Sequence, residues 1–293
     1  MEIIATLRKK SLLDKLIPVV DGVIIGKYFT TSYNYSLDDL KQINNICKDN
    51  NIKVYIALDN FISEDEKPLL YEYFDFLNEM NVDGIYFHDL GVISVAKGYG
   101  MLKKLIYDGK TVLCNSLDTA FILANGIDSV VLSREITLKE IKDIIHKNAG
   151  KVDLQIFGHL RMSYSKRKFL KNYFNEINKD YDYLNKETLY LVEEKRDYKM
   201  PIVEDENGTY IYTDYILEMF NEINDLKTYL KRGIVDTLFI EDDSLIVQVC
   251  RDYKRISQEN KDFILEALHH TYKYDYSSAY LYQRTNIIKH EQD

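Results

Sequence analysis

The chain has 293 residues, of which 46% are hydrophobic and 29% are charged, with 12 glycines and only 3 prolines. This composition is too apolar and too poor in glycine and proline for a disordered chain, and it allows a large buried core. The formal net charge of -9 excludes a surface that is basic throughout, so nucleic-acid binding would need a local basic patch.

The first seven residues, Met-Glu-Ile-Ile-Ala-Thr-Leu, lack the basic segment and following apolar stretch of a signal peptide. No apolar run approaches the ~18 residues that a membrane-spanning helix needs. We therefore expect a soluble, cytoplasmic protein with no membrane partner.

Eight short, β-branched, apolar runs recur along the chain. They are continuously apolar rather than alternating, which is typical of strands covered on both faces. The predicted strands are Ile3–Leu7, Gly22–Gly26, Lys53–Leu58, Gly84–His88, Lys104–Tyr107, Ser129–Ser133, Asp153–Phe157 and Thr237–Glu241.

Apolar residues at helical spacing separate these strands, over residues 37–47, 138–145 and 216–230. Ser36 and Asp39 predict an N-terminal cap for the first helix, and Gly233 predicts the end of the third.

Strand–helix alternation of this kind predicts an α/β fold, a parallel (β/α)8 TIM-like barrel. An open doubly wound sheet is the alternative, but its glycine-rich loop after the first strand is absent from residues 7–11. We expect the barrel domain to span residues 1–256 and a helical extension with a tail to span 257–293.

The alternation breaks over about residues 158–215, a polar stretch between the seventh and eighth predicted strands. Insertions that follow a barrel strand lie on the C-terminal face, where active sites form, so we expect function to concentrate there. Within this insertion, Asn207-Gly208 between two extended runs predicts a hairpin.

Polar residues that follow predicted strands are the first site candidates. Arg134 and Glu135 follow the sixth strand, and an arginine at a barrel mouth can bind a carboxylate or phosphate. Their structural alternative is an ion pair with a helix end. His88 and Asn115 belong to the same rim.

The insertion opens with a basic segment, which we define as residues 161–171. Five cations there alternate with aromatic residues, a composition that suits single-stranded RNA. The alternative is a solvated loop that pairs with the acidic residues 193–194 and 204–206. The cations are Arg161, Lys166, Arg167, Lys168 and Lys171.

Three cysteines, Cys47, Cys114 and Cys250, lie far apart and form no C-x-x-C pair. This spacing excludes a disulfide scaffold and the usual zinc and iron–sulfur patterns. Each lies in an apolar stretch, so we expect buried structural thiols and no metal site.

Several short motifs follow one another in a consistent order, and together they resemble the peptidase U32 family, the collagenase-like proteases, over about residues 1–256. The resemblance also implies a (β/α)8 barrel and is strongest for the short members found in Firmicutes. The motifs are Asp21–Gly26, Asp89–Ile93, Asn115, Leu132–Glu135, Ser163–Ser165, Lys166-Arg167, Asn172–Phe174, Pro201–Ile211 and Asp236–Glu241.

The departures from the family pattern matter equally. Arg161 and Lys168 stand where family members that hold a [4Fe–4S] cluster have cysteines, so we expect no cluster and no other cofactor. Phe239 and Asp242-Asp243 replace the Lys and Gly-Arg of the last-strand pattern, and the arginine that the family has near residues 30–34 is missing.

The resemblance implies two activities. Some members are named as peptidases, and others support hydroxylation of RNA bases, including the wobble uridine of tRNA. We expect a component of tRNA wobble-uridine 5-hydroxylation, partner-dependent or non-catalytic, with tRNA and a longer cysteine-bearing paralogue as partners. The alternatives are a metal-independent peptidase and a degenerate, non-enzymatic binding protein.

The expected site residues fall into three groups. The catalytic candidates are Arg134, Glu135, His159 and Glu241; the substrate-binding candidates are His88, Asn115, Arg161, Ser163 and Ser165; the RNA-binding candidates are Lys166, Arg167, Lys168 and Lys171.

Overall fold

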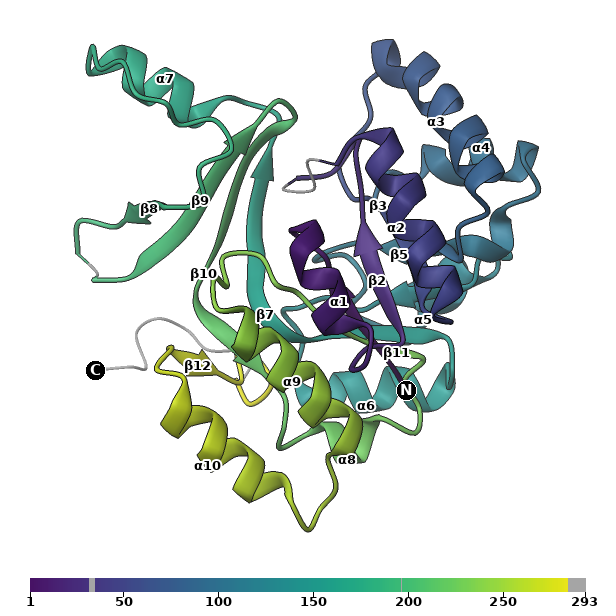
Figure 1. The fold of residues 1–293 in the computed structure, drawn as a ribbon, viewed down its shortest axis with the longest axis vertical. Helices are drawn as coiled ribbons and strands as arrows, with labels where there is room; N and C mark the ends of the chain where they lie inside the picture. Colours follow the sequence, from purple (N-terminus) through teal and green to yellow (C-terminus); the bar gives the residue numbers. More distant parts are fainter. Residues whose placement is uncertain (32–34, 196, 284–293) are drawn as a thin grey trace.

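The computed structural model describes residues 1–31, 35–195 and 197–283, and within these ranges eight parallel strands close into a barrel. Closure comes from β11, which pairs in parallel with both β1 and β7 (Figure 1). This confirms the predicted (β/α)8 barrel and rejects the open sheet. The barrel strands are β1 (Glu2–Thr6), β2 (Gly22–Ile25), β3 (Lys53–Leu58), β4 (Gly84–Phe87), β5 (Leu105–Asp108), β6 (Ser129–Val131), β7 (Val152–Ser165) and β11 (Arg232–Val235).

Helices surround the barrel and follow its strands, as Figure 1 shows. The predicted cap of α2 is present: the Ser36 hydroxyl accepts from the Asp39 backbone N–H at 3.0 Å, and Asp39 accepts from the Ser36 N–H. The helices are α1 (Leu13–Leu16), α2 (Leu37–Asp49), α3 (Lys67–Met80), α4 (Gly91–Gly98), α5 (Ser116–Leu123), α6 (Leu138–Lys147), α7 (Phe169–Glu176), α8 (Ile223–Leu226), α9 (Asp243–Arg255) and α10 (Lys261–Thr271).

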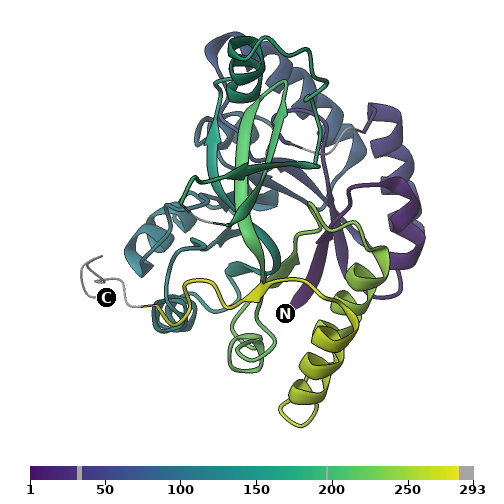
Figure 2. The same cartoon turned by 90° about the vertical axis from the view of Figure 1, so that its left-hand side faces the viewer.

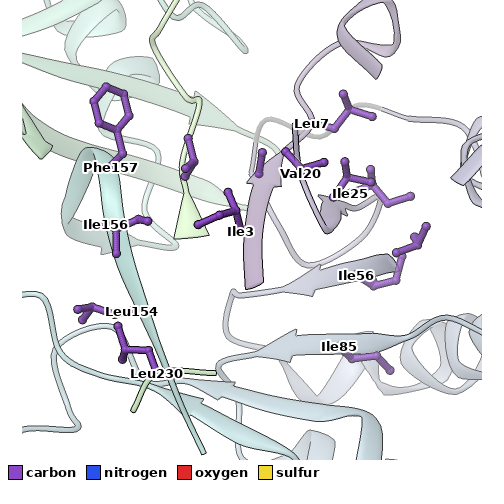
Figure 3. Close-up of a cluster of buried hydrophobic side chains, with 14 of the residues drawn as sticks. Ile3, Leu7, Val20, Ile25, Ile56, Ile85, Leu154, Ile156, Phe157 and Leu230 are labelled. Atoms are coloured by element: carbon purple, nitrogen blue, oxygen red, sulfur yellow. The ribbon is translucent and has the colours of Figure 1, made fainter. Parts of the chain in front are cut away.

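The core has two layers. Residues such as Ile3, Ile25, Ile56 and Ile85 belong to the large cluster between strands and helices (Figure 3). The strand residues that point the other way form a smaller cluster inside the barrel. They include Ile4, Ile24 and Ile106. Both faces of the sheet are therefore covered, which explains why the strands are continuously apolar in sequence.

A buried ion pair fills the N-terminal end of the barrel. Arg232 Nη1 lies 2.8 Å from Asp153 Oδ2, and the Tyr86 hydroxyl donates to the same carboxylate oxygen at 3.0 Å. Arg232 is 2% exposed and Asp153 is fully buried. Because these charges are buried and paired with each other at the end of the barrel opposite the mouth, the cluster belongs to the scaffold and not to a functional site.

The insertion forms an antiparallel sheet that protrudes from the barrel mouth (Figures 1 and 2). β7 continues past the barrel to Ser165 and pairs with β10 (Gly208–Glu218), which pairs in turn with β9 (Lys199–Asp205) and then β8 (Leu189–Val192). Asp205 faces Gly208 across the β9–β10 turn, so the predicted hairpin is confirmed. We call β7 beyond the barrel, β8, β9 and β10 the protruding sheet.

Two predictions near the last barrel strand are wrong. The eighth strand is β11, not Thr237–Glu241, which forms a loop in which Phe239 has a φ of 63°. The predicted helix over 216–230 is a strand up to Glu218 and helical only in α8, and Gly233 lies within β11 rather than at a helix end. β11 was not recognised in the sequence because it begins with Arg232, and a charged residue interrupts the apolar run that marks the other strands.

The chain from residue 257 contains α10 and the short strand β12 (Tyr276–Ser277), which pairs in parallel with β10. Residues 284–293 of the expected tail, and residues 32–34 near the missing family arginine, lie outside the described residues. No helix in the described ranges is both long and apolar enough to span a membrane.

Candidate functional site

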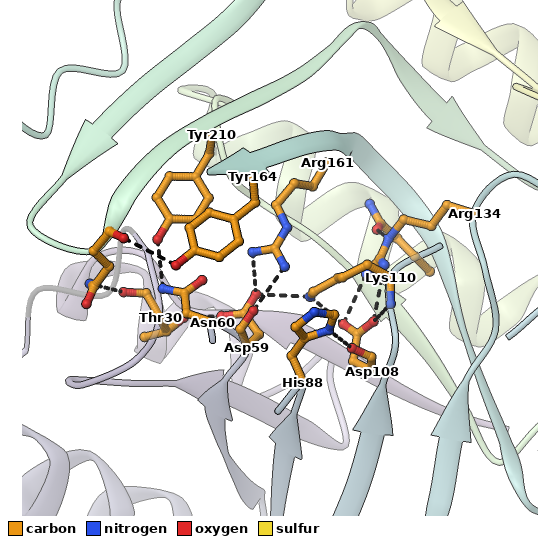
Figure 4. A network of polar contacts seen from close by, with 12 residues as sticks. Thr30, Asp59, Asn60, His88, Asp108, Lys110, Arg134, Arg161, Tyr164 and Tyr210 are labelled. Atoms are coloured by element: carbon orange, nitrogen blue, oxygen red, sulfur yellow. Dashed lines mark hydrogen bonds and ion pairs between the residues drawn. The ribbon is translucent and has the colours of Figure 1, made fainter. Parts of the chain in front are cut away.

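Charged side chains from the strands β3, β5, β6 and β7 meet at the C-terminal end of the barrel, together with His88 after β4 (Figure 4). Asp59 follows β3, and its carboxylate lies 2.9 Å from Lys110 Nζ and 3.1 Å from Arg161 Nη1. The Thr30 hydroxyl donates to the other carboxylate oxygen at 2.6 Å. We call this group and its neighbours the mouth network.

Asp108, the last residue of β5, holds the second half of the network. Arg134 donates to both carboxylate oxygens of Asp108 at 3.2 Å, in the bidentate geometry that arginine favours. Lys110 Nζ also donates to Asp108 at 2.5 Å, so this lysine bridges the two aspartates. Arg134 Nε donates to Gln155 on β7 at 2.6 Å, which fixes the orientation of the guanidinium.

His88 follows β4 and lies beside the two aspartates. Its Nδ1 is 3.0 Å from the Asp108 backbone oxygen, which can only accept, so Nδ1 carries the proton and Nε2 is the acceptor. Burial lowers the pKa of His88, so the ring is neutral at pH 7. A neutral imidazole with a free Nε2 is the form that a general base requires.

Aromatic rings cover the network from the side of the protruding sheet. Tyr164 stacks on Tyr210 with 4.8 Å between ring centroids, and Phe61 stacks on Tyr164 at 5.8 Å. The Arg161 guanidinium lies 5.6 Å from the Tyr164 ring, and the Asn60 amide lies 2.7 Å from the Tyr210 hydroxyl. These contacts tie the sheet to the barrel rim.

The electrostatics favour ionised aspartates. Burial alone would raise the pKa of Asp59, but the charges of Lys110 and Arg161 outweigh it and hold the pKa at about 2. Arg134 and Lys110 likewise hold the pKa of Asp108 well below its ordinary value despite burial. Three cations therefore face two carboxylates, and the mouth network carries one net positive charge.

A pocket of about 280 Å³ adjoins the network, because Thr30 both lines it and donates to Asp59. Arg8, Glu187 and Asp205 also line the pocket, and Arg8 pairs with Glu187. Burial raises the pKa of Glu187 and of Asp205. The mouth thus combines positive charge, a neutral imidazole and carboxyl groups with raised pKa values, which suits recognition of a small anion and proton transfer.

Three of the expected mouth residues lie outside this network. The Asn115 side chain caps α5, where it accepts from the backbone N–H groups of Leu117 and Asp118 at 2.9 Å. Glu135 is exposed, and Glu241 is exposed in the loop after β11. Asn115 therefore has a structural function in this fold.

The remaining candidates are the substrate-binding candidates Ser163 and Ser165 and the catalytic candidate His159, and all three lie on β7. Ser163 is exposed on β7, and the Ser165 hydroxyl accepts from the Arg167 backbone N–H at 3.2 Å. His159 is buried, with Nδ1 2.8 Å from the Thr213 carbonyl oxygen, and it lines a separate cleft rather than the mouth network.

The basic segment is only partly free to bind a ligand. Arg161 belongs to the mouth network, Lys166 Nζ lies 2.8 Å from the Glu66 carboxylate, and the Lys168 ammonium donates to the Asp205 carbonyl oxygen. The partner of Lys166 is thus on the barrel, not in the acidic runs of the insertion. Arg167 is exposed in the connection between β7 and α7, and Lys171 is exposed on α7.

The cysteines do not fit a [4Fe–4S] cluster. Cys47 is buried on α2 and Cys250 on α9, and burial raises the pKa of each thiol to about 12, far from the thiolate that ligates iron. Cys114 is exposed, which corrects the expectation that all three thiols are buried. No cluster of metal ligands occurs among residues 1–31, 35–195 and 197–283.

Sequence reasoning missed Asp108 and Lys110, the residues that join the two halves of the network. The sequence did contain a signal for a site residue at this point. Two charged residues and a glycine directly follow the predicted strand that ends at Tyr107, in the order Asp108-Gly109-Lys110. Residues at strand ends of a barrel face the mouth irrespective of any motif.

Comparisons with known proteins give consistent results. The sequence model of the family described as peptidase family U32 matches residues 28–290 of this chain. tRNA hydroxylation protein P2 of Bacillus subtilis strain 168 is 30% identical over 195 residues, which cover 66% of this chain and 63% of the relative. tRNA hydroxylation protein P1 of the same organism is 26% identical over 157 residues, covering 52% of this chain and 37% of the relative.

An uncharacterized protease of Methanocaldococcus jannaschii is 32% identical over 145 residues, covering 48% of this chain and 35% of the relative. This chain thus aligns with less than two thirds of the length of each of these relatives. The solved structure of a U32 peptidase superposes with a TM-score of 0.50 at 12% identity, covering 80% of this chain and 92% of that one. At this identity the superposition supports the fold alone.

Proposed function

The chain belongs to peptidase family U32, and on that premise we propose that it is a component of tRNA wobble-uridine 5-hydroxylation. The observation that carries the proposal is the 30% identity to tRNA hydroxylation protein P2, joined by the similarity to P1. Two relatives named for the same process support it more strongly than one relative named as an uncharacterized protease.

In this proposal the mouth network binds a small anionic reactant. Arg134 and Arg161 orient it through the net positive charge of the network, and His88 Nε2 accepts a proton from it. The buried ion pairs fix these groups before a ligand binds, which limits the reorganisation that binding requires.

The chain's partners in this proposal are tRNA and a longer, cysteine-bearing paralogue. The supporting observation is that burial raises the pKa of the Cys47 and Cys250 thiols and that the three cysteines lie in separate segments of the chain, which leaves any [4Fe–4S] cluster to the paralogue. Exposed Arg167 and Lys171 are proposed to contact the phosphates of the tRNA backbone.

A peptidase with a serine or cysteine nucleophile has less support. Within the described residues, His88 and His159 bond through Nδ1 to backbone carbonyls, and neither bonds to a serine or cysteine. Neither of these two imidazoles is therefore placed to activate a serine or cysteine nucleophile within the described residues.

Expression of this chain in a Bacillus subtilis strain that lacks tRNA hydroxylation protein P2 tests the proposal. We expect 5-hydroxyuridine to return in bulk tRNA, measured by nucleoside mass spectrometry, and the purified chain to leave gelatin intact. Gelatin cleavage that depends on His88, without any return of 5-hydroxyuridine, would favour the peptidase instead.

A further inference from the structure

A cleft of about 760 Å³ lies between the protruding sheet and the segment 269–276, apart from the mouth network. Its walls come from β7 to β10 on one side and from the loop after β11 and the start of β12 on the other. In Figure 2, which faces the protruding sheet, the yellow segment with β12 crosses below the sheet. This volume lies within the range of about 300–1,000 Å³ that is usual for ligand-binding clefts, so the cleft is large enough to admit a short ligand segment.

Aromatic rings dominate the walls of this cleft. Tyr190 on β8 is 54% exposed and Tyr274 is 37% exposed, so both present ring surface to solvent. Tyr276 stacks on His269 with 4.6 Å between centroids, and Phe239 meets His159 edge to face at 6.0 Å. Rings from four separate chain segments therefore converge on one cavity.

Polar groups accompany the rings. Lys199 and Lys273 bring ammonium groups to the rim, and Asp214 and Asp275 bring carboxylates to the wall. The Tyr276 hydroxyl is buried without a hydrogen-bond partner among the described residues. His159 Nδ1 lies 2.8 Å from the Thr213 carbonyl oxygen, and its ring forms part of the wall.

We propose that this cleft binds a short, single-stranded segment of RNA, with bases stacked on Tyr190 and Tyr274 and phosphates at Lys199 and Lys273. Aromatic faces stack any base, ammonium groups neutralise phosphates, and carboxylates can accept from base N–H groups. The proposal rests on the proposed function and assigns the unpaired anticodon loop to a specific surface.

The cleft suits bases better than the basic segment does. In that segment Arg161, Lys166 and Lys168 already have partners within the protein, and Tyr164 is stacked between Phe61 and Tyr210. In the cleft no described residue forms an ion pair with Lys199 or Lys273; the Lys273 ammonium donates to the His269 carbonyl oxygen at 2.9 Å, and the Tyr190 ring is open. The basic segment is left to contact backbone phosphates only.

Fluorescence anisotropy with a labelled anticodon stem-loop RNA and the purified full chain tests the cleft. We expect the double variant Tyr190→Ala and Tyr274→Ala to weaken binding at least about tenfold, since two stacking contacts are lost. Lys199→Ala should weaken it less and lower the slope of log affinity against log salt by about 0.7.

Tyr71→Ala is the matched control, because Tyr71 lies on α3 away from the cleft and is 51% exposed, close to the 54% of Tyr190. It should leave the affinity unchanged. A duplex RNA of the same sequence should compete weakly, because its bases are not available to stack. Circular dichroism of each variant verifies the fold.

Two results would overturn the cleft assignment: no binding of the stem-loop by the wild type, or equal affinity of the wild type and the double variant. Loss of a protein partner in the double variant with RNA affinity intact would assign the cleft to that partner and overturn it as well. The anisotropy titration measures RNA binding alone. The 5-hydroxyuridine content of tRNA from a deletion strain tests the proposed function, so failure of the cleft assignment can be told apart from failure of the proposed function.

Discussion

The guanidinium of Arg161 lies 3.1 Å from the carboxylate of Asp59, although the two residues are 102 positions apart in the chain. A second guanidinium nitrogen donates to the Asp59 backbone oxygen at 3.0 Å. Arg161 comes from the part of β7 that extends past the barrel, so this pair fastens the protruding sheet over the C-terminal ends of the strands.

Removing Arg161 should destabilise the protein. Arg161→Ala leaves Asp59 with one fewer cation in a buried position, and we expect the free energy of unfolding in urea to fall by about 3 kcal/mol. Arg167→Ala, an exposed cation on the same segment, should change it by less than about 0.5 kcal/mol. Equal effects of the two substitutions would mean that the Arg161–Asp59 pair does not fasten the sheet.

Gly158 is the position where β7 leaves the barrel, and it admits no side chain. Its φ is +114°, and an added Cβ would lie 2.3 Å from the Asp236 backbone oxygen. We expect Gly158→Ala to lower the free energy of unfolding by about 2 kcal/mol or more. Gly98→Ala at the end of α4 meets no atom within 4 Å and should be neutral or stabilising by up to about 1 kcal/mol.

Glu218 at the end of β10 makes stability depend on pH. Burial raises the pKa of Glu218 from 4.5 to about 7, so the folded state binds an extra proton between these values. The contribution of this group to stability is then complete below pH 4.5 and is lost as the pH rises through 7. We expect Glu218→Gln to be more stable than the wild type at pH 8, by an amount on the order of 3 kcal/mol.

Chemical denaturation of both proteins from pH 4 to pH 8 measures this difference. The gap between Glu218→Gln and the wild type should widen as the pH rises and should close near pH 4. Glu135→Gln, an exposed carboxamide substitution, is the control and should track the wild type throughout. A constant gap would show that the Glu218 carboxyl does not titrate with a raised pKa.

Exposed Arg167 and Lys171 should contribute to RNA affinity through charge alone. Replacing both by alanine should weaken stem-loop binding and reduce the slope of log affinity against log salt by about 1.4, since each single-strand phosphate contact contributes about 0.7. Lys97→Ala on α4 serves as the control because it removes an exposed cation far from the insertion in sequence. An unchanged slope in the double variant would exclude phosphate contacts at this segment.

Much of the fold could be predicted from local sequence. Seven strands of the barrel were found as apolar runs because helices cover their outer face and side chains fill the barrel. Ser36 with Asp39 and Asn207-Gly208 were recognised because a capping box and a tight turn depend on adjacent residues only.

The errors arose where distant residues decide the outcome. β11 begins with Arg232, whose burial is compensated by ion pairs with Asp153 on β7, 2.8 Å away, and with Asp128 before β6. Asn115 was placed in the site because it follows a strand, but its side chain turns to cap α5. Asp108 and Lys110 were missed because no motif marks them, and only barrel closure brings them to Asp59 and Arg134.

The content of 5-hydroxyuridine in tRNA from a strain that lacks this gene is the measurement that tests the central claim most directly. Nucleoside mass spectrometry should show that 5-hydroxyuridine falls sharply in the deletion strain and returns when the wild-type gene is restored. Expression of His88→Ala at equal protein level should restore little of it, since His88 Nε2 is the proposed proton acceptor at the mouth. An unchanged amount of 5-hydroxyuridine in the deletion strain would contradict a function in tRNA hydroxylation.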